Sequence, residues 1–305
     1  MDIARIYLEI MHRNSDIKTH VIEVAYKNKK VAVASPYWKP GEDFLQMITS
    51  SVRGRIEDGD FVTVSEKAIS TALGNILDES IIHPSLLARF LAKYWMCLVW
   101  GYVLGLLCHL REETIRRLRA YPIREGSAHK QVALQYAGFL QALMHGSEGA
   151  IDGSNLPFSY VSFPLKDAQA LAEQIQKRIK AELGKKVIVM IIDTDTTYSL
   201  RNFHFTPRPK PIRGIHSCGG AIAYILGRFF KLKRSATPVA IAGSKLDTKK
   251  ALTIADIANR TRGFGAGRTV WDMAETFNVA LTGVTWKMLS KIEHKPIVIL
   301  KRRRT

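Results

Sequence analysis

Two carboxylates directly follow the most apolar short run of the chain. Residues 187–192 read Val-Ile-Val-Met-Ile-Ile, a run apolar enough for a strand buried on both faces, and Asp193, Thr194 and Asp195 come next. Ligands of open sheets gather beyond the carboxyl ends of strands, and Mg²⁺ prefers one or two carboxylates together with substrate phosphates. The pattern therefore indicates a metal site, although Asp and Thr are also common in the turn that ends a strand.

Two glycine-containing segments offer further contacts for an anionic ligand. Residues 149–155 read Gly-Ala-Ile-Asp-Gly-Ser-Asn, in which glycine allows close approach of the backbone, Asp152 adds a carboxylate and Asn155 an amide. Residues 263–268 read Gly-Phe-Gly-Ala-Gly-Arg, and such turns present backbone N–H groups to phosphates while Arg268 adds a charged fork. The second segment is not a Walker A loop, because it lacks the required Gly-Lys-Ser/Thr. Either segment is also compatible with a plain loop.

Periodic apolar positions predict the elements that hold these residues. Leu171, Ile175, Ile179 and Leu183 recur every fourth residue, which predicts a helix with one apolar face that ends at Gly184. Pro84 and Ser85 are expected to open a helical middle section. Short β-prone runs predict strands at 21–25, 31–34, 61–64, 187–192, 239–242 and 296–300.

The charge of the chain points to anionic partners. The 305 residues carry a net charge of +18, with a pI near 9.9. Such a field attracts nucleotides, phosphorylated small molecules, nucleic acid or acidic lipid, and charge alone does not choose among them. The basic residues concentrate late in the chain, and the alternative is a solvated basic face with a basic tail; they include Arg201, Arg208, Lys210, Arg213, Arg228, Lys231, Lys233, Arg234, Lys301, Arg302, Arg303 and Arg304.

Cysteine use and hydropathy predict a cytoplasmic protein without a membrane partner. The three cysteines form no CxxC pair, which argues against a disulfide framework or a structural zinc site and suits a reducing compartment. The N-terminus lacks a basic segment followed by an apolar stretch. The most apolar segment, 94–110, contains Gly101, Gly105, Cys108 and His109, and we expect a core or dimer-interface helix there rather than a membrane span.

Three segments, taken in order, resemble the coenzyme F420-0:γ-glutamyl ligases. Residues 59–74 are similar to the family's strand and turn near the nucleotide. Residues 149–155 are similar to its G-I-D-x-S-N motif, and residues 187–194 to its apolar strand ending in D-T. The early loop at 35–43 and Ala255-Asp256 also resemble family segments. The resemblance covers most of the chain and is weakest at 81–146 and at the C-terminus.

This resemblance implies a ligand set. Asp152 and Asp193 would be metal ligands, with Thr194 at a second ion and Asp195 beside them; the expected ions are two Mg²⁺ or Mn²⁺, with K⁺ in addition. GTP would be the co-substrate. Its contacts would be Pro36, Tyr37, Glu66, Lys67 and Asn155, with the phosphates wrapped by Gly263, Gly265, Gly267 and Arg268.

The resemblance also implies a fold and a reaction. The family fold is α+β, with two lobes in an intertwined homodimer, and here it would form a single unit over 1–305 with lobes 1–146 and 147–305. GTP would phosphorylate a carboxylate of F420-0 or a related phosphorylated acceptor, and the amine of L-glutamate would attack the resulting acyl phosphate. Metal ions would neutralise the charge that develops during phosphoryl transfer.

Three departures from the family pattern leave alternatives open. Thr71 stands where the family usually has lysine, and Leu73 and Ile257 stand where it usually has glutamate. Acceptor contacts are therefore less well retained than metal ligands. One alternative is a non-catalytic or repurposed relative that binds nucleotide or nucleic acid through the basic face, although no nucleic-acid recognition motif is evident. Another is a different nucleotide-dependent phosphoryl-transfer enzyme on the same scaffold.

Overall fold

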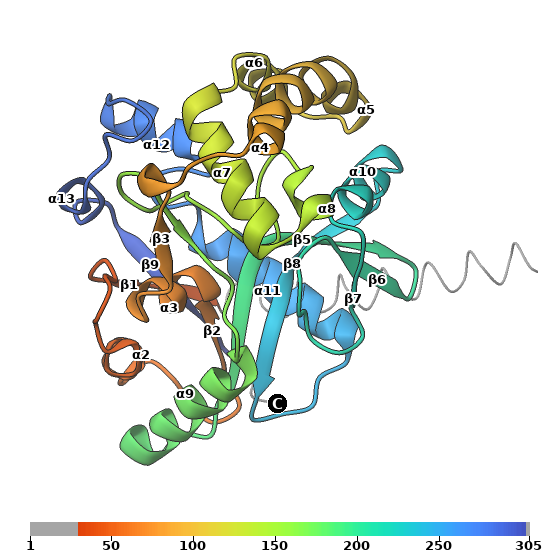
Figure 1. The fold of residues 1–305 in the computed structure, drawn as a ribbon. Coiled ribbons are helices and arrows are strands. Elements are labelled where there is room, and N and C mark those ends of the chain that lie inside the picture. Colours follow the sequence, from red (N-terminus) through yellow and green to blue (C-terminus); the bar gives the residue numbers. More distant parts are fainter. Residues whose placement is uncertain (1–29, 303–305) are drawn as a thin grey trace, which may run out of the picture.

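A mixed β-sheet forms the centre of the molecule (Figure 1), which is a computed structural model that describes residues 30–302. The order of its seven strands is β1-β9-β2-β5-β6-β7, with β8 paired to β5. The strand predicted at 21–25 and the basic residues Arg303 and Arg304 lie outside the described residues. The strands are β1 (Lys30–Ser35), β2 (Phe61–Ser65), β5 (Ile188–Leu200), β6 (Phe203–Thr206), β7 (His216–Ser217), β8 (Lys233–Ala242) and β9 (His294–Leu300).

Both faces of this sheet are covered by helices, which gives a mixed α+β architecture. Helices α2 (Phe44–Val52) and α9 (Ala168–Leu183) pack on one face, where Ile48, Ile175 and Ile179 join the largest core cluster. The predicted C-cap is confirmed, since Gly184 adopts the left-handed conformation. Helix α11 (Thr248–Arg262) packs on the opposite face. The sheet contains strands from both predicted lobes, 1–146 and 147–305, so the two ranges share one sheet.

Strand β5 is longer than the apolar run that predicts it. Its first half pairs in parallel with β2, from Phe61 opposite Ile188 to Ser65 opposite Ile192. The strand then continues to Leu200 alongside β8, with a register shift between Asp193 and Thr196. The prediction that the strand ends before Asp193 is therefore wrong: the two acids lie in an irregular segment within β5, just beyond the carboxyl end of β2. A bulge of this kind re-aims side chains.

A helical layer lies at one end of the sheet, at the top of Figure 1. It is held together by an apolar cluster around Met96, Trp100 and Leu118. Its elements are α4 (Leu86–Phe90), the π-helix η2 (Leu91–Leu104), α5 (Gly105–Leu107), α6 (Glu112–Arg119), α7 (Ile123–Tyr136), α8 (Phe139–Ala142) and α10 (Ala221–Phe229). The connecting elements are α3 (Glu66–Ala72), η1 (Glu79–Ile81), α12 (Val270–Phe277), α13 (Trp286–Leu289) and the small sheet of β3 (Ile76–Asp78) with β4 (Tyr160–Ser162).

The apolar segment predicted as a core or interface helix is one continuous helical stretch, Leu86–Leu107. By length and composition it is the one helix among residues 30–302 that could cross a membrane, and 33% of its apolar window is buried inside the protein. Its inner side is anchored by Trp95 and Trp100, whose indole nitrogens both donate to the carbonyl oxygen of Leu143, at 2.8 and 2.7 Å. Its outer side is exposed.

Candidate functional site

A cavity of about 1030 Å³ lies between the helical layer and the central sheet. It collects most of the predicted site residues although they come from distant parts of the chain. Two predicted residues, Pro36 and Glu66, are not among the residues that line it. Those that do line it are Tyr37, Lys67, Asp152, Asn155, Asp193, Thr194, Asp195, Gly263, Gly265, Gly267 and Arg268.

The β5 carboxylates have oxygens without hydrogen-bond partners. Asp193 Oδ2 and Asp195 Oδ2 are both buried and accept no hydrogen bond from the described residues. Burial and the neighbouring charge of Asp193 raise the pKa of Asp195 well above its usual value. Buried carboxylate oxygens without a hydrogen bond are costly unless positive charge compensates them, and Arg208 Nη1, 3.5 Å from Asp193 Oδ2, supplies part of that charge. The two carboxylates, with Asp152 in the same cavity, therefore fit a hard divalent cation that is also bound by ligand oxygens.

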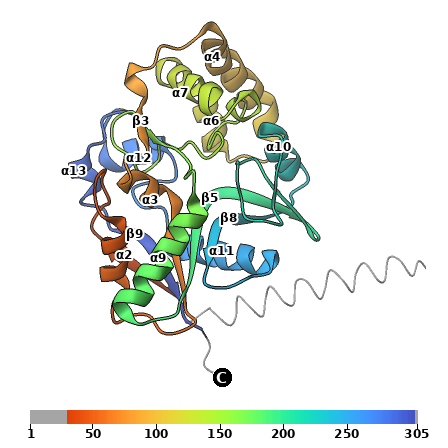
Figure 2. The same ribbon diagram turned by 60° about the horizontal axis from the view of Figure 1, so that its bottom comes forward.

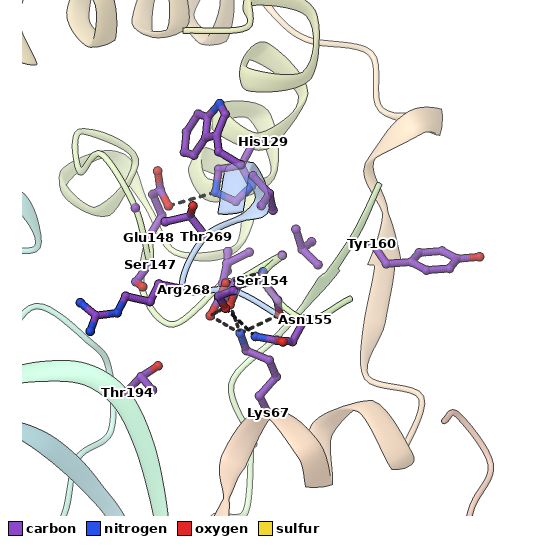
Figure 3. Close-up of a pocket in the computed structure, with 18 of the residues that line it drawn as sticks. Lys67, His129, Ser147, Glu148, Ser154, Asn155, Tyr160, Thr194, Arg268 and Thr269 are labelled. Carbon is purple, nitrogen blue, oxygen red and sulfur yellow. Dashed lines mark hydrogen bonds and ion pairs between the residues drawn. The ribbon is translucent and has the colours of Figure 1, made fainter. Parts of the chain in front are cut away.

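Three basic side chains already face these acids. Lys67 Nζ pairs with Asp152 and donates to the carbonyl and hydroxyl oxygens of Ser154, at 2.9 and 2.6 Å (Figure 3). Arg262 lines the cavity; burial lowers its pKa, against the opposing effect of Asp193 and Asp152. The guanidinium of Arg208 lies 3.5 Å from Asp193 Oδ2. Three basic side chains thus lie near the three acids, with Arg208 shared between Asp193 and Glu66, and a triphosphate would bring further negative charge to these basic side chains.

Glu66, predicted to contact the nucleotide, is instead part of a buried ion pair. Its carboxylate accepts from the Leu165 backbone N–H at 2.9 Å and lies 3.0 Å from Arg208 Nη1. Both side chains are almost fully inaccessible. Burial lowers the pKa of Arg208, but Glu66, Asp193 and Asp195 outweigh that effect and raise it. Glu66 therefore fixes Arg208 beneath the carboxylates of β5, and it does not line the cavity.

Asn155 fastens the second glycine-rich segment to the first. Its amide nitrogen donates to the carbonyl oxygens of Phe264 and Gly267, at 3.1 and 2.9 Å, and its Oδ1 accepts from Ala266 N at 2.7 Å. The Tyr37 hydroxyl donates to the Asn155 carbonyl oxygen. The side chain predicted to contact the nucleotide is thus fully engaged within the protein, and it sets the position of the loop at 263–268.

That loop requires glycine at its centre. Gly265 has a φ of +59°, and a Cβ there would lie 2.5 Å from Asn155 Oδ1. The loop leads into α12, whose first turn is closed by a capping box between Thr269 and Asp272. The Arg268 guanidinium stacks over the Phe264 ring at 3.8 Å. The backbone N–H groups of Ala266, Gly267, Arg268 and Thr269 are bonded within the protein, so the positive charge of Arg268 is what this loop offers to a phosphate group.

A buried charged network on the helical side of the cavity was not predicted. His129, on α7, lies 2.7 Å from Glu79 and 2.9 Å from Glu148, the latter contact being visible in Figure 3. Lys130 lies 2.5 Å from Glu148. Burial lowers the pKa of His129, but the two carboxylates outweigh it and raise the pKa well above its usual value. Glu148 directly precedes the loop of Asp152, so the network fastens that loop to α7. The position of Glu148 beside Gly149 was the one sequence signal for it.

A compact group of acids elsewhere has a different role. Oxygens of Glu113, Asp272 and Glu275 lie within 4.8 Å of one another. Arg117 pairs with all three, at 2.6, 2.7 and 2.8 Å. Because a guanidinium already satisfies these carboxylates, this group ties α6 to α12 and is not the metal candidate.

Comparison with known proteins identifies relatives of the chain. Residues 32–242 match the family model described as F420-0:Gamma-glutamyl ligase. An uncharacterized protein of Methanocaldococcus jannaschii is 37% identical over 281 residues, which cover 88% of this chain and 94% of that protein. The coenzyme F420:L-glutamate ligase of Archaeoglobus fulgidus is 29% identical over 160 residues, 52% of this chain and 57% of that protein. The enzyme of the same name from Methanopyrus kandleri is 24% identical over 157 residues, 51% and 55% of the two chains.

Proposed function

We propose that this chain, which belongs to the F420-0:gamma-glutamyl ligase family, joins L-glutamate through an amide bond to coenzyme F420-0 or a related acidic acceptor. The proposed co-substrate is GTP, and the proposed metals are two Mg²⁺ or Mn²⁺ ions with K⁺ in addition. Two relatives carry the name coenzyme F420:L-glutamate ligase, which supports this choice of substrates. We further propose that the protein works as a cytoplasmic homodimer.

One observation carries the proposal. Asp193 and Asp195 each have a buried oxygen without a hydrogen-bond partner, and both residues line the same cavity as Asp152 and the glycine loop at 263–268. A cation and a polyphosphate together would suit this cavity, because the carboxylates would bind the cation while Lys67, Arg262 and Arg268 would meet the charge of the phosphates. Buried polar atoms without a hydrogen-bond partner are rare in native proteins, and two of them at this place support a bound ligand.

In the proposed reaction, a carboxylate oxygen of the acceptor attacks the γ-phosphorus of GTP, and GDP leaves. The resulting acyl phosphate is attacked by the glutamate amine, the carbon–nitrogen bond forms and inorganic phosphate leaves. When bound, the metal ions neutralise phosphate charge as the phosphoryl group moves. Arg262 and Lys67 provide fixed positive charge toward the same group, and the loop held by Asn155 orients the phosphates.

The acceptor contacts are where this chain departs from the family pattern. Thr71 is buried against the cavity, and its hydroxyl donates to the Lys67 carbonyl oxygen at 2.8 Å. Leu73 is 49% exposed, and Ile257 is a buried residue of α11 in the apolar cluster that this helix forms with the sheet. None of the three offers a charge to a ligand. We therefore propose that the acceptor carboxylate is recognised from the opposite, helical wall of the cavity, where Arg124 and His83 stand.

Substrate-dependent nucleotide turnover tests the proposal. GDP formation from GTP is measured with Mn²⁺ or Mg²⁺, with and without F420-0 and with and without glutamate. A ligase forms GDP efficiently only when both are present, and Asp193→Asn abolishes it. Metal-dependent binding of GTP without turnover would keep the nucleotide site and reject F420-0 as the acceptor. Absence of nucleotide binding would favour the alternative of a non-catalytic or repurposed relative, which the basic face and Thr71 support.

A further inference from the structure

The outer side of the Leu86–Leu107 helix and the adjoining helix α10 expose large apolar side chains. Leu98, Tyr102 and Leu106 are each more than half exposed. On α10 and directly after it, Leu226, Phe229 and Phe230 are also exposed, Phe230 to 63%. Exposed patches of large apolar side chains mark surfaces that bind a membrane or another protein.

These two elements form one surface, which we call the apolar–basic face. Arg228 of α10 donates to the carbonyl oxygens of Cys108 and His109 at the end of the long helix, at 2.9 and 3.0 Å. Helix α10 therefore lies against α5, and it also contacts β6. Both ribbon views place α10 between the other helices of the helical layer and the β5–β6 hairpin (Figures 1 and 2).

The face is basic and free of acids along both segments that build it. Residues 80–111 and residues 196–246 contain no Asp or Glu. Arg89 and Lys93 stand among the exposed apolar residues of the helix; Lys231 directly follows Phe230, and Arg234 comes three residues later. Apolar side chains interleaved with lysine and arginine are the composition of surfaces that lie on anionic lipid.

We propose that the apolar–basic face attaches this protein to the surface of an anionic membrane. A lipid surface satisfies both features at once, because its acyl region takes up the leucine and phenylalanine side chains and its phosphates meet the basic ones. Nucleic acid would leave the aliphatic side chains without a role. A symmetric pair of copies joined through this face would place an acid-free basic surface against itself.

The helix would lie along the membrane and would not cross it. Its inner side packs on α6, where a Cβ added to Gly105 would lie 3.1 Å from Ile115 Cγ1. Trp100 and Met96 on that side are fully buried. The expectation of no membrane partner considered only a spanning helix; attachment by one exposed side leaves the interior packing intact.

Cosedimentation with lipid vesicles tests the proposal. The full chain is mixed with vesicles of phosphatidylcholine alone and with an equimolar mixture of phosphatidylcholine and phosphatidylglycerol. We expect binding only to the mixture, weakened by added NaCl. Phe229→Ser with Phe230→Ser should abolish it. Lys231→Gln with Arg234→Gln should weaken it roughly 25-fold, at about fivefold for each charge removed. The matched control, Lys177→Gln with Lys180→Gln on the exposed side of α9, removes the same charge and should bind like wild type.

Three results would overturn the proposal. The first is failure of the wild-type chain to bind the mixed vesicles. The second is unchanged binding by both variants of the face, provided that circular dichroism shows them folded. The third is a wild-type dimer without lipid affinity that becomes monomeric in sedimentation velocity when Phe229 and Phe230 are replaced, because the face would then join two copies.

Discussion

The substitution Gly265→Ala tests whether Asn155 sets the position of the glycine-rich loop. The new Cβ would lie 2.5 Å from Asn155 Oδ1, on a residue whose φ is +59°. A left-handed alanine costs about 1–2 kcal/mol. If Asn155 is displaced, its bond to Ala266 N is also lost, with about 0.5–1.5 kcal/mol for that bond alone. The free energy of unfolding should therefore fall by roughly 1.5–3.5 kcal/mol.

The matched control is Gly184→Ala, at the end of α9. Gly184 has a similar φ of +65°, but a Cβ there would meet no atom within 4 Å. It should therefore cost only the conformational part, about 1–2 kcal/mol. Urea unfolding measures both variants, and calorimetry measures GTP affinity with Mn²⁺ present. Only Gly265→Ala should weaken GTP binding. Equal stability losses with equal, unchanged GTP affinities would refute the role assigned to Asn155.

Three further perturbations follow from the charged groups. Lys67→Met frees Asp152 of its ion pair, so Mn²⁺ should bind about tenfold more tightly in the absence of nucleotide, as measured by electron paramagnetic resonance; weaker binding would contradict the competition between Lys67 and the metal. Arg208→Met leaves Glu66 and Asp193 buried without their cation and should cost about 3–5 kcal/mol of unfolding free energy, whereas Arg178→Met, at an exposed pair with Glu182, should cost about 1 kcal/mol or less. The third concerns pH. Because the pKa of His129 is raised, its contribution is complete below the unfolded value of 6.5 and is lost as pH rises through the folded pKa. Because Lys130 and His129 outweigh the burial of Glu148 and lower its pKa, the contribution of Glu148 is complete above the unfolded value of 4.5 and is lost as pH falls. Their joint stabilisation should therefore be greatest between pH 4.5 and 6.5, and a double variant, His129→Leu with Glu148→Gln, should lose most stability in that window; a loss independent of pH would contradict the network.

Local pattern was sufficient to predict most elements near the site. The four-residue period of α9, the Gly184 cap and the strand from Phe61 are local features, and the structure confirms them. The course of β5 after Ile192 was not predictable in this way. Asp193 and its neighbours are polar and end the apolar run, but pairing with β8 continues the strand through them. That pairing joins residues roughly forty positions apart, and no local signal specifies it.

The same limit applies to individual side chains of the site. Glu66 and Lys67 are adjacent in sequence and were both predicted to face the nucleotide. At the start of α3 their side chains point in different directions. Lys67 contacts Asp152 in the cavity, whereas Glu66 forms a buried pair with Arg208, 142 residues away. The side-chain amide of Asn155 likewise donates hydrogen bonds to a loop more than 100 residues further along the chain. Composition identified such residues as candidates, but only tertiary packing decides which atoms remain available to a ligand.

The most direct test of the proposed ligase activity is mass spectrometry of the acceptor. F420-0 is incubated with the protein, GTP, L-glutamate and Mn²⁺, in parallel with Asp193→Asn and with the surface control Lys177→Gln. The proposal predicts that the mass of F420-0 increases by one or more glutamyl residues with wild type and with the control, and does not change with Asp193→Asn. An unmodified acceptor in the wild-type reaction, or an equal product from Asp193→Asn, would contradict it.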